Sequence, residues 1–537
     1  MIIFVSDAFT EQYTGGAELT TDAIIEASLF PINKVLSSNV NLDLMTKNKN
    51  CFWIFGNFSG LSDDCVLYAI KNLSYSIVEY DYKFCKYRSI DKHEAAEGRC
   101  DCHDQRNGKL IATFFAKSKI NFWMSEKQCQ IYENLFPFLK NNFVLNSVFS
   151  DETLSYITSL DIQDKNEKWI ILDSSSWIKG KEESISYAVE NNLSYELVWG
   201  LSYDKMLKKL AKSKGLLFLP LGADTCPRLV MEAKLLGCEL VLNENVQHKD
   251  EKWFESRESI ISHLETRGDT FWRKIEEVAF EKLNFSKIES DSTVHFKVIA
   301  PFYNARAWLP KCIQSLKAQR YENFECYMID DMSIDDSFAV AEEAVASDKR
   351  FKVIKNRKKF YALENIARAI DMSQNNDEDI IILLDGDDWL STSYSLDILA
   401  EAYKESDCLM TYGSYIYHPG GSRGVEPSPY PQEVVESNLF REDQWRASHL
   451  RSFKYFLWRN LDQNDLTDKD NKYYTMAYDQ AIMLPLLEMA SSRFKYIKDS
   501  LYVYNKTNPL NVDKIKAIQQ TNTAQEIRRK KKYDVLK

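Results

Sequence analysis

Three aspartates follow an apolar run in the second half of the chain. The segment IIILLDGDDWL, residues 380–390, places Asp385, Asp387 and Asp388 directly after five aliphatic residues. Carboxylates this close repel one another, so the cluster costs stability unless a cation, water or hydrogen-bond donors offset the repulsion. One interpretation is a solvated acidic turn after a buried strand. The other is a divalent-metal site at the edge of a sheet.

The pattern around this cluster predicts the elements that position it. Strands are expected at 296–303, 324–331, 351–356 and 379–388, and helices at 309–319, 337–347 and 363–373. This βαβαβαβ order is typical of a doubly wound α/β sheet, which binds ligands at the carboxyl ends of its strands. Asp330 and Asp331 end one strand and Asp385 follows another, so we expect both acidic groups at one edge.

Two acidic groups at one sheet edge suit a nucleoside diphosphate and a divalent cation, Mn²⁺ or Mg²⁺. These cations prefer carboxylate and phosphate oxygens, whereas carboxylates alone would repel the phosphates. The stretch VIAPFYNARAWLPKCIQSLKAQRYENFECYMIDDMSIDDS and the later LLDGDDWL resemble glycosyltransferase family 2, which has a GT-A fold. The resemblance extends over roughly residues 295–510.

The family resemblance implies roles for individual residues at the donor site. Pro301 would line the nucleobase pocket, and Asp330 or Asp331 would contact the base or ribose. Asp385 would meet the ribose or the metal, and Asp387 would ligate the metal. The metal would neutralise the leaving nucleoside diphosphate as a Lewis acid.

The resemblance also implies a catalytic base and a third metal ligand. Asp479, in MAYDQAIMLPLLEMA, matches the family aspartate that deprotonates the acceptor, although Tyr478 replaces the acid usually found before it. The alternative is a charge that stabilises a helix N-terminus. His449 matches a histidine that completes the metal shell in some relatives, and a packed histidine is the alternative. Asn356 and Asn365 match two asparagines around the third strand.

The first half of the chain carries a second set of ligand-binding signals. Gly15 and Gly16 lie between the first predicted strand and helix, where glycine lets a ligand approach the helix N-terminus. The stretch GADTCPRLVMEAKLLGCELVLNE resembles the nucleotide-sugar signature of glycosyltransferase family 4, which has a GT-B fold. The resemblance implies that Asp224 and Glu232 hold the positions of its two acids, and that Lys179, in WIKGK, belongs to its Lys-Gly segment. A noncatalytic scaffold is the alternative for this half.

Strand candidates at 2–6, 51–58, 120–125, 167–175 and 215–222 alternate with helix-like segments in this first half. The predicted fold class is therefore α/β throughout: a GT-B-like pair of Rossmann-type lobes, followed by a GT-A doubly wound mixed sheet. We expect the lobes at 1–150 and 151–288 and the third domain, with a C-terminal helical extension, at 289–537. The segment SKIESDST, residues 286–293, is the predicted linker.

One cysteine-rich stretch falls outside both motifs. CKYRSIDKHEAAEGRCDCH contains Cys85, His93, Cys100, Cys102 and His103, whose side chains could hold zinc. The spacing does not match the common paired C-x-x-C pattern, so free thiols in a polar loop are the expected interpretation. Zinc binding remains the alternative.

Composition narrows the class of protein. The net charge of −11 argues against a mainly electrostatic nucleic-acid binder, and no apolar run approaches the roughly 18 residues that span a bilayer. The start reads as a strand rather than a signal peptide, so we expect a cytoplasmic protein. The basic tail at 528–532 is expected to be a solvated helix end. The alternative is at most a weak, peripheral contact with anionic lipid.

The combined motifs predict a glycosyltransferase of the hexosyltransferase type. It would move a sugar from a nucleotide sugar, with a UDP-sugar as the first choice, to a glycan or glycoconjugate acceptor. Transfer in the C-terminal domain would be metal-dependent and inverting, and a second site in the first half would make the chain bifunctional. The alternatives are a carbohydrate- or nucleotide-binding protein with decayed catalysis, and nucleotidyl transfer, which lacks its Gly-rich basic signature here.

Overall fold

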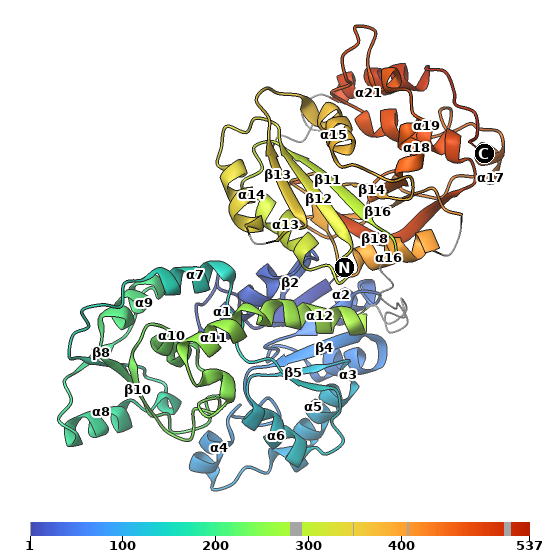
Figure 1. The fold of residues 1–537 in the computed structure, drawn as a ribbon. Coiled ribbons are helices and arrows are strands. Elements are labelled where there is room, and N and C mark those ends of the chain that lie inside the picture. The colour runs from blue at the N-terminus through green and yellow to red at the C-terminus, as the bar shows by residue number, and fades with distance from the viewer. Residues whose placement is uncertain (1, 280–292, 347, 405–406, 510–516, 537) are drawn as a thin grey trace. The chain divides into compact units, whose positions relative to one another are not determined.

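The computed structural model describes residues 2–279, 293–346, 348–404, 407–509 and 517–536. The chain forms two compact units (Figure 1), one made of Met1–Ser28 and Ile32–Leu283 and the other of Leu29–Pro31 and Asn284–Lys537. Each unit has its own sheets and core. The predicted linker at 286–293 lies outside the described residues, apart from Thr293.

The first lobe of the N-terminal unit is a six-stranded parallel sheet in the order β2-β1-β3-β4-β5-β6. Its central strands are apolar and fully buried, which is typical of a parallel sheet covered on both faces. The strands are β1 (Ile2–Ser6), β2 (Ile32–Leu36), β3 (Phe52–Phe55), β4 (Ser74–Glu79), β5 (Asn121–Trp123) and β6 (Asn142–Val144). The helices are α1 (Gly16–Glu26), α2 (Leu42–Lys47), α3 (Asp63–Asn72), α4 (Ile90–Glu97), α5 (Arg106–Lys117) and α6 (Glu126–Leu135).

The second lobe of this unit is a four-stranded parallel sheet in the order β10-β9-β7-β8. Its strands are β7 (Trp169–Leu172), β8 (Tyr195–Val198), β9 (Gly215–Phe218) and β10 (Glu239–Leu242). Its helices are α7 (Asp151–Ser159), α8 (Lys181–Glu190), α9 (Tyr203–Lys212), α10 (Arg228–Leu235) and α11 (Arg257–Glu265).

Helix α12 (Arg267–Ala279) follows the second lobe in sequence but packs on the first. The indole Nε1 of Trp272 donates to the carbonyl of Ile24 at 2.7 Å, and the ring of Phe271 lies 4.5 Å from that of Phe122. Figure 1 shows α12 beside α1. This returning helix ties the two lobes into one unit.

The C-terminal unit contains an eight-stranded mixed sheet in the order β13-β12-β11-β14-β17-β16-β18-β15. Strands β11 to β14 are parallel neighbours, and β17 joins β14 antiparallel. The strands are β11 (Phe296–Phe302), β12 (Phe324–Asp330), β13 (Phe351–Lys355), β14 (Ile380–Leu383), β15 (Trp389–Leu390), β16 (Met410–His418), β17 (Arg451–Lys454) and β18 (Phe494–Asn505). The helices are α13 (Leu309–Lys317), α14 (Ser337–Val345), α15 (Tyr361–Met372), α16 (Ser395–Lys404), α17 (Gln432–Glu436), α18 (Tyr455–Arg459), α19 (Tyr478–Ala490) and α21 (Ala517–Arg528).

Cores on both faces bury the parallel part of this sheet. Strand β11 is buried at every position because its alternate side chains enter different cores. Val298 and Phe302 pack with α13, α14 and α16, whereas Ile299 packs with α15 and α19. The predicted α/β class, with parallel sheets first and a mixed sheet after them, is confirmed.

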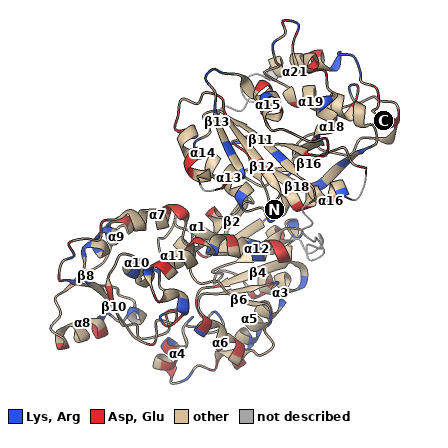
Figure 2. Ribbon diagram, viewed as in Figure 1, with Lys and Arg blue, Asp and Glu red and all other residues tan. Residues whose placement is uncertain are grey.

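Charged residues of both signs are interspersed in both units (Figure 2). Several cations of the tail at 528–532 bind the unit itself: Arg528 donates to the carbonyls of Arg441 and Asp443, and Lys530 to that of Thr467. The tail is therefore more closely attached than the solvated helix end expected from the sequence. In the part of the chain that the structure describes, no helix has the length and apolar character needed to cross a bilayer.

Candidate functional site

The acidic loop after β14 lies against the end of β11. The amide of Gly386 donates to the carbonyl of Pro301 at 3.1 Å, and a Cβ on Gly386 would lie 2.5 Å from that of Phe302. Only glycine fits between the aspartates at this approach. Pro301 is therefore part of the wall behind the predicted donor site.

Neutral donors hold the three aspartates of this loop. The Tyr478 hydroxyl donates to Oδ1 of Asp385 at 2.8 Å, and the Asn508 side chain donates to Oδ2 of Asp387 at 2.6 Å. Asp388 accepts from the Tyr502 hydroxyl at 2.6 Å and from the Asn505 amide at 2.7 Å. Asp388 is buried, whereas Asp385 and Asp387 are partly exposed. The last two are therefore the carboxylates available to a ligand.

Burial and mutual repulsion shift the proton affinities in this loop. Burial, with the charge of Asp385 adding to it, raises the pKa of Asp387 to about 6 despite the Asn508 hydrogen bond. Burial and the charges of its two neighbours raise the pKa of Asp388 well above its usual range. A bound cation would relieve this repulsion.

The N-terminus of α19 lies beside the acidic loop. Asp479 stands in the first turn of α19, next to the Tyr478 that binds Asp385. Burial raises the pKa of Asp479, and the nearby guanidinium of Arg451 opposes that shift. The Nε and Nη1 of Arg451 are buried without a hydrogen-bond partner. The structure thus brings Asp385, Asp479 and a buried cation into one neighbourhood.

His449 is a packed histidine beside this neighbourhood. Its ring stacks on Tyr502 at 4.3 Å, and Nη2 of Arg451 lies 2.8 Å from its Nδ1. Burial, followed by the charge of Arg451, lowers the pKa of His449 well below its usual range, so the ring is neutral. Its predicted role as a metal ligand stays a prediction.

The two aspartates at the end of β12 differ in what they bind. Asp331 accepts from the amides of Phe360 and Tyr361 at 2.7 and 2.9 Å, so its carboxylate holds the loop before α15. Asn356 bridges the Asp331 carboxylate and Asn365. Asp330 accepts from the Ser333 amide, while its Oδ2 is buried without a partner. Asp330, which is fully buried, therefore has a carboxylate oxygen without a hydrogen-bond partner.

The donor set of the acidic loop fits a hard divalent cation. Partly exposed carboxylates of Asp385 and Asp387, one residue apart and held by neutral donors, are the oxygen ligands that Mg²⁺ and Mn²⁺ prefer. These two do not form a preformed triad with His449. Within the described ranges, three or more His, Cys, Asp or Glu ligand atoms lie within 4.8 Å of one another only at Cys85, His93, Cys100 and Cys102.

The predicted site residues of the N-terminal unit line one cavity of about 700 Å³ between its lobes. Gly15 and Gly16 come from the first lobe, and Lys179, Asp224 and Glu232 from the second. Gly180, at φ 62°, caps α8, and a Cβ there would lie 1.7 Å from the Leu219 carbonyl. This close approach explains the glycine after Lys179.

The acids of this cavity are already paired with cations. Lys179 lies 2.5 Å from Asp224, and Arg228 lies 3.4 Å from Glu232. Glu232 is 3% exposed and accepts from the Tyr203 hydroxyl at 2.7 Å. Burial raises the pKa of Glu232, and Arg228 opposes the shift.

Several residues of these sites were not identified from the sequence. Arg451, Tyr502 and Asn508 come from segments far from the D-x-D motif and have no motif of their own. Arg228 immediately follows Pro227 inside the family 4-like stretch, so its position as the first residue of α10 was a usable signal.

Comparison with known proteins identifies part of the C-terminal unit. The sequence from 297 to 462 matches the family described as Glycosyl transferase family 2. Residues 297–462 are a glycosyltransferase family 2 domain. The domain contains Asp330, Asp385, Asp387 and His449, and Asp479 follows it. The resemblance inferred for the C-terminal half is confirmed.

Similar curated proteins are glycosyltransferases. The uncharacterized glycosyltransferase EpsJ of Bacillus subtilis (strain 168) is 25% identical over 223 residues, which cover 41% of this chain and 62% of EpsJ. Glycosyltransferase GlyA of Streptococcus pneumoniae serotype 4 is 24% identical over 213 residues, covering 38% of this chain and 30% of GlyA. The chain thus spans less than two thirds of either relative.

Solved structures show weak overall likeness. S. aureus TarS 1-349 in complex with UDP-GlcNAc is 17% identical with a TM-score of 0.33, over 40% of this chain and 59% of that one. Mannosyltransferase PcManGT from Pyrobaculum calidifontis, in complex with GDP-Man and Mn²⁺, is 14% identical with a TM-score of 0.33, over 47% of this chain and 72% of that one.

Proposed function

We propose that the C-terminal unit is a metal-dependent, inverting glycosyltransferase that uses a nucleoside-diphosphate sugar. The proposal rests mainly on the hydrogen bond from Tyr478, at the start of α19, to Asp385 in the acidic loop. Asp479 is the next residue of α19, so this contact supports its proposed role beside the donor. The family 2 match over 297–462 supports the same reaction class.

The proposed reaction is a single displacement at the anomeric carbon. The Asp479 carboxylate takes the proton of the acceptor hydroxyl, the acceptor oxygen bonds to the anomeric carbon, and the bond to the diphosphate breaks on the opposite face. Burial raises the pKa of Asp479, which suits a base, and the charge of Arg451 opposes that rise. The nucleoside diphosphate leaves as an anion.

The remaining residues bind and orient the donor. Asp385 and Asp387 would hold Mn²⁺ or Mg²⁺, which supplies Lewis-acid charge neutralisation at the diphosphate when bound. Asp330, whose Oδ2 is unpartnered, accepts hydrogen bonds from the base or ribose. A UDP-sugar is the first choice of donor and a glycan or glycoconjugate the acceptor, with the reaction in the cytoplasm.

Turnover with a panel of UDP- and GDP-sugars, read as nucleoside-diphosphate release with Mn²⁺, tests this proposal. Asp479→Asn should lower kcat by about 100-fold or more while donor affinity stays within a few-fold, because only the base is lost. Asp499→Asn, at an exposed aspartate of β18, is the matched control. An Asp479→Asn enzyme with wild-type kcat would remove the proposed base.

A second function is favoured by the cavity of the N-terminal unit, where five residues predicted from separate motifs line one space. We propose that this cavity binds a nucleotide sugar through Glu232 and the ribose hydroxyls, whether as a second transferase site or as a noncatalytic module. A carboxylate accepts two hydrogen bonds from a diol, which suits this contact.

Paired substitutions separate the two sites. Glu232→Gln should abolish nucleotide binding in the N-terminal unit and leave the Asp479-dependent turnover unchanged. Glu239→Gln, at an exposed position of β10, is the control. Equal loss of both activities in Glu232→Gln would show that the units do not act separately.

A further inference from the structure

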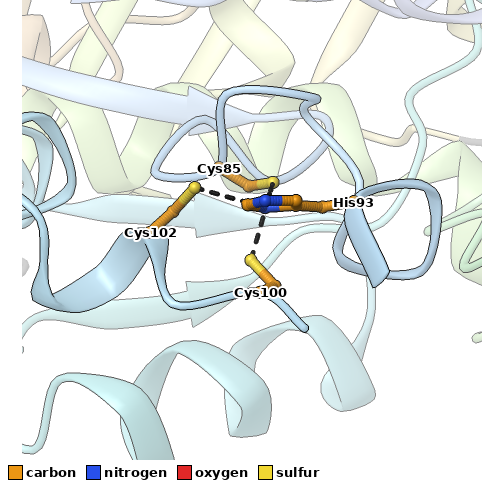
Figure 3. Close-up of side chains that lie close together, drawn as sticks. All are labelled: Cys85, His93, Cys100 and Cys102. Carbon is orange, nitrogen blue, oxygen red and sulfur yellow. Dashed lines mark hydrogen bonds between the residues drawn. The ribbon is translucent and has the colours of Figure 1, made fainter. Parts of the chain in front are cut away.

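Four metal-binding side chains converge in the first lobe, and none of them lines the cavity of the N-terminal unit. Cys85 lies in the segment after β4, His93 on α4, Cys100 after that helix, and Cys102 at the start of the 3₁₀ turn Cys102–Asp104. Figure 3 shows the three sulfurs arranged around the imidazole. His103, the fifth residue of the sequence cluster, points to Asp104 instead, with 3.2 Å between Nε2 and Oδ2.

The surroundings differ from the polar loop expected from the sequence. Cys85, His93 and Cys102 are 1%, 2% and 6% exposed, and Cys100 is partly buried. The difference arises because α4 presents His93 inward, and Gly98, at φ 87°, then turns the chain back toward the sulfurs. Residues separated by a helix in sequence therefore meet in space.

The spacing of the ligand atoms is that of a tetrahedral metal site. With Zn–S bonds of about 2.3 Å and Zn–N bonds of about 2.0 Å, a tetrahedron has edges of about 3.8 Å between sulfurs and about 3.5 Å from sulfur to nitrogen. The Sγ atoms of Cys85 and Cys100 are 3.7 Å apart. Nδ1 of His93 lies 3.6 Å from the sulfur of Cys85 and 3.4 Å from that of Cys102. All four ligand atoms lie within 4.8 Å of one another.

Outer hydrogen bonds orient the ligands as in a built metal site. Nε2 of His93 lies 3.1 Å from the Glu97 carboxylate. When Nε2 carries the proton and donates it to Glu97, the lone pair of Nδ1 faces the sulfurs, as in carboxylate–histidine–zinc arrangements. Burial raises the pKa of the Cys85 and Cys100 thiols in the metal-free chain, so a metal must displace their protons when it binds.

The packing around the cluster fixes the segments that carry it. Ser89 caps α4 by accepting from the Lys92 amide. A Cβ on Gly108, in α5, would lie 1.9 Å from the Cys102 carbonyl, so α5 presses against the ligand-bearing turn. The four residues are thus held from both sides.

We propose that Cys85, His93, Cys100 and Cys102 bind one structural Zn²⁺ that fixes α4 in the first lobe. Three thiolates and one imidazole form a closed tetrahedral set, which suits a structural rather than a catalytic zinc. Binding displaces the thiol protons into solvent and forms three Zn–S bonds and one Zn–N bond, with no change in oxidation state.

The proposed zinc site would also affect the cavity of the N-terminal unit. Asp91, in the first turn of α4, accepts from the amide of Ala223 at 2.8 Å. That amide stands next to Asp224, which lines the cavity. A zinc that fixes α4 therefore also holds the loop that carries Asp224, and its loss should weaken nucleotide binding there.

Metal analysis of the purified full-length chain, by mass spectrometry of its elements, tests the proposal. We expect one zinc per chain, retained through gel filtration in buffer without added metal. Co²⁺ substituted for zinc should give the intense sulfur-to-cobalt charge-transfer and d–d absorption of a tetrahedral thiolate site. Zinc content at background level, or a Cys85–Cys100 disulfide found by intact-mass analysis of a zinc-free chain, would overturn the proposal.

Matched variants locate the site. Cys100→Ser and Cys102→Ser should lower zinc content and the melting temperature together, because zinc binding contributes to folding. His103→Ala, in the same stretch but outside the set, and Cys51→Ser, a partly buried thiol elsewhere in the lobe, should keep one zinc per chain. If a cysteine variant fails to fold, the Co²⁺ spectrum of the wild-type chain still decides. Full zinc in Cys102→Ser would also contradict the assignment.

Discussion

The two units hold their acidic groups in opposite ways. In the N-terminal cavity each acid has a cation of its own, Lys179 beside Asp224 and Arg228 beside Glu232. In the C-terminal unit, the Asp385 and Asp387 side chains are bound by neutral groups, a tyrosine and an asparagine. The N-terminal cavity thus carries its own positive charge, whereas the proposed donor site at the acidic loop would need a cation from outside to receive a diphosphate.

This difference predicts whether each site needs a metal ion to bind a diphosphate. Carboxylates repel phosphates, so a diphosphate can approach the acidic loop only with a dication between them. In the proposed nucleotide complex of the N-terminal cavity, Lys179 and Arg228 would supply the positive charge for a phosphate. Nucleotide binding should therefore depend on Mn²⁺ or Mg²⁺ in one unit and be independent of added metal in the other.

The largest expected effect comes from removing a proposed metal ligand. Asp387→Asn should lower nucleoside-diphosphate release by at least about 100-fold, because the leaving group loses its counter-ion. Initial rates at saturating donor and Mn²⁺ are the measurement. Asp470→Asn, at an exposed aspartate in a turn, is the control. Full activity in Asp387→Asn would show that the C-terminal site does not need this metal ligand. The two units would then not differ in their need for a metal ion.

Protons should compete with the cation for Asp387, so cation binding should be weaker at low pH. Because the pKa of Asp387 is raised to about 6, the carboxylate is ionised above that pH and protonated below it. The apparent Kd for Mn²⁺ should rise by about tenfold for each pH unit below about 6 and be nearly constant above it. Titrations of Mn²⁺ with UDP between pH 4.5 and 8 measure this. A flat profile would place the cation elsewhere.

A smaller effect is expected from the contact that joins α19 to the acidic loop. Tyr478→Phe removes the hydroxyl that donates to Asp385 and keeps the ring, so kcat should fall by about tenfold. Tyr478→Phe should leave the melting temperature within a few degrees of wild type. Tyr455→Phe, which leaves the acidic loop untouched, is the control. Equal kcat in both variants would mean that this contact does not position the site.

The smallest effect at neutral pH should come from Arg451. Its guanidinium lowers the pKa of Asp479 against the rise caused by burial. Arg451→Met should therefore raise that pKa and move the acidic limb of the kcat profile to higher pH, while kcat on the plateau changes less. Arg451→Lys, which keeps the charge, should restore most of the wild-type profile. If the acidic limb of the kcat profile does not move in Arg451→Met, the charge of Arg451 does not influence the pKa of Asp479.

The sequence predicted the parallel strands β11 to β14 of the C-terminal sheet, but it missed β16 and β18 of that sheet and β2 of the first lobe, for a physical reason. Strands such as β11 and β14 are continuous apolar runs because both of their faces are covered. Strands β2, β16 and β18 mix polar and apolar residues, so their strand character depends on neighbours far away in the chain. Local patterns do not contain that information.

The candidate sites show the same limit at the level of residues. Asp385, Asp387 and Asp224 stand in short motifs and could be identified one by one. Tyr502 and Asn508 support the acidic loop from the other end of the domain, and only the fold brings them there. The burial of the cysteine cluster was not predicted for a related reason, since the inward turn of α4 brings His93 to the sulfurs and no spacing rule anticipates it.

If the acidic loop holds a dication for the diphosphate, UDP binding to the C-terminal unit depends on the metal, and calorimetry of UDP binding measures this dependence. The full-length chain carrying Glu232→Ala, which silences the N-terminal cavity, is titrated with UDP in metal-depleted buffer free of chelator, and again with Mn²⁺. We expect UDP to bind at one site, only in the presence of Mn²⁺, and this binding to be lost when Asp387→Asn is added. UDP binding of equal affinity without Mn²⁺, or binding that survives Asp387→Asn, would contradict it.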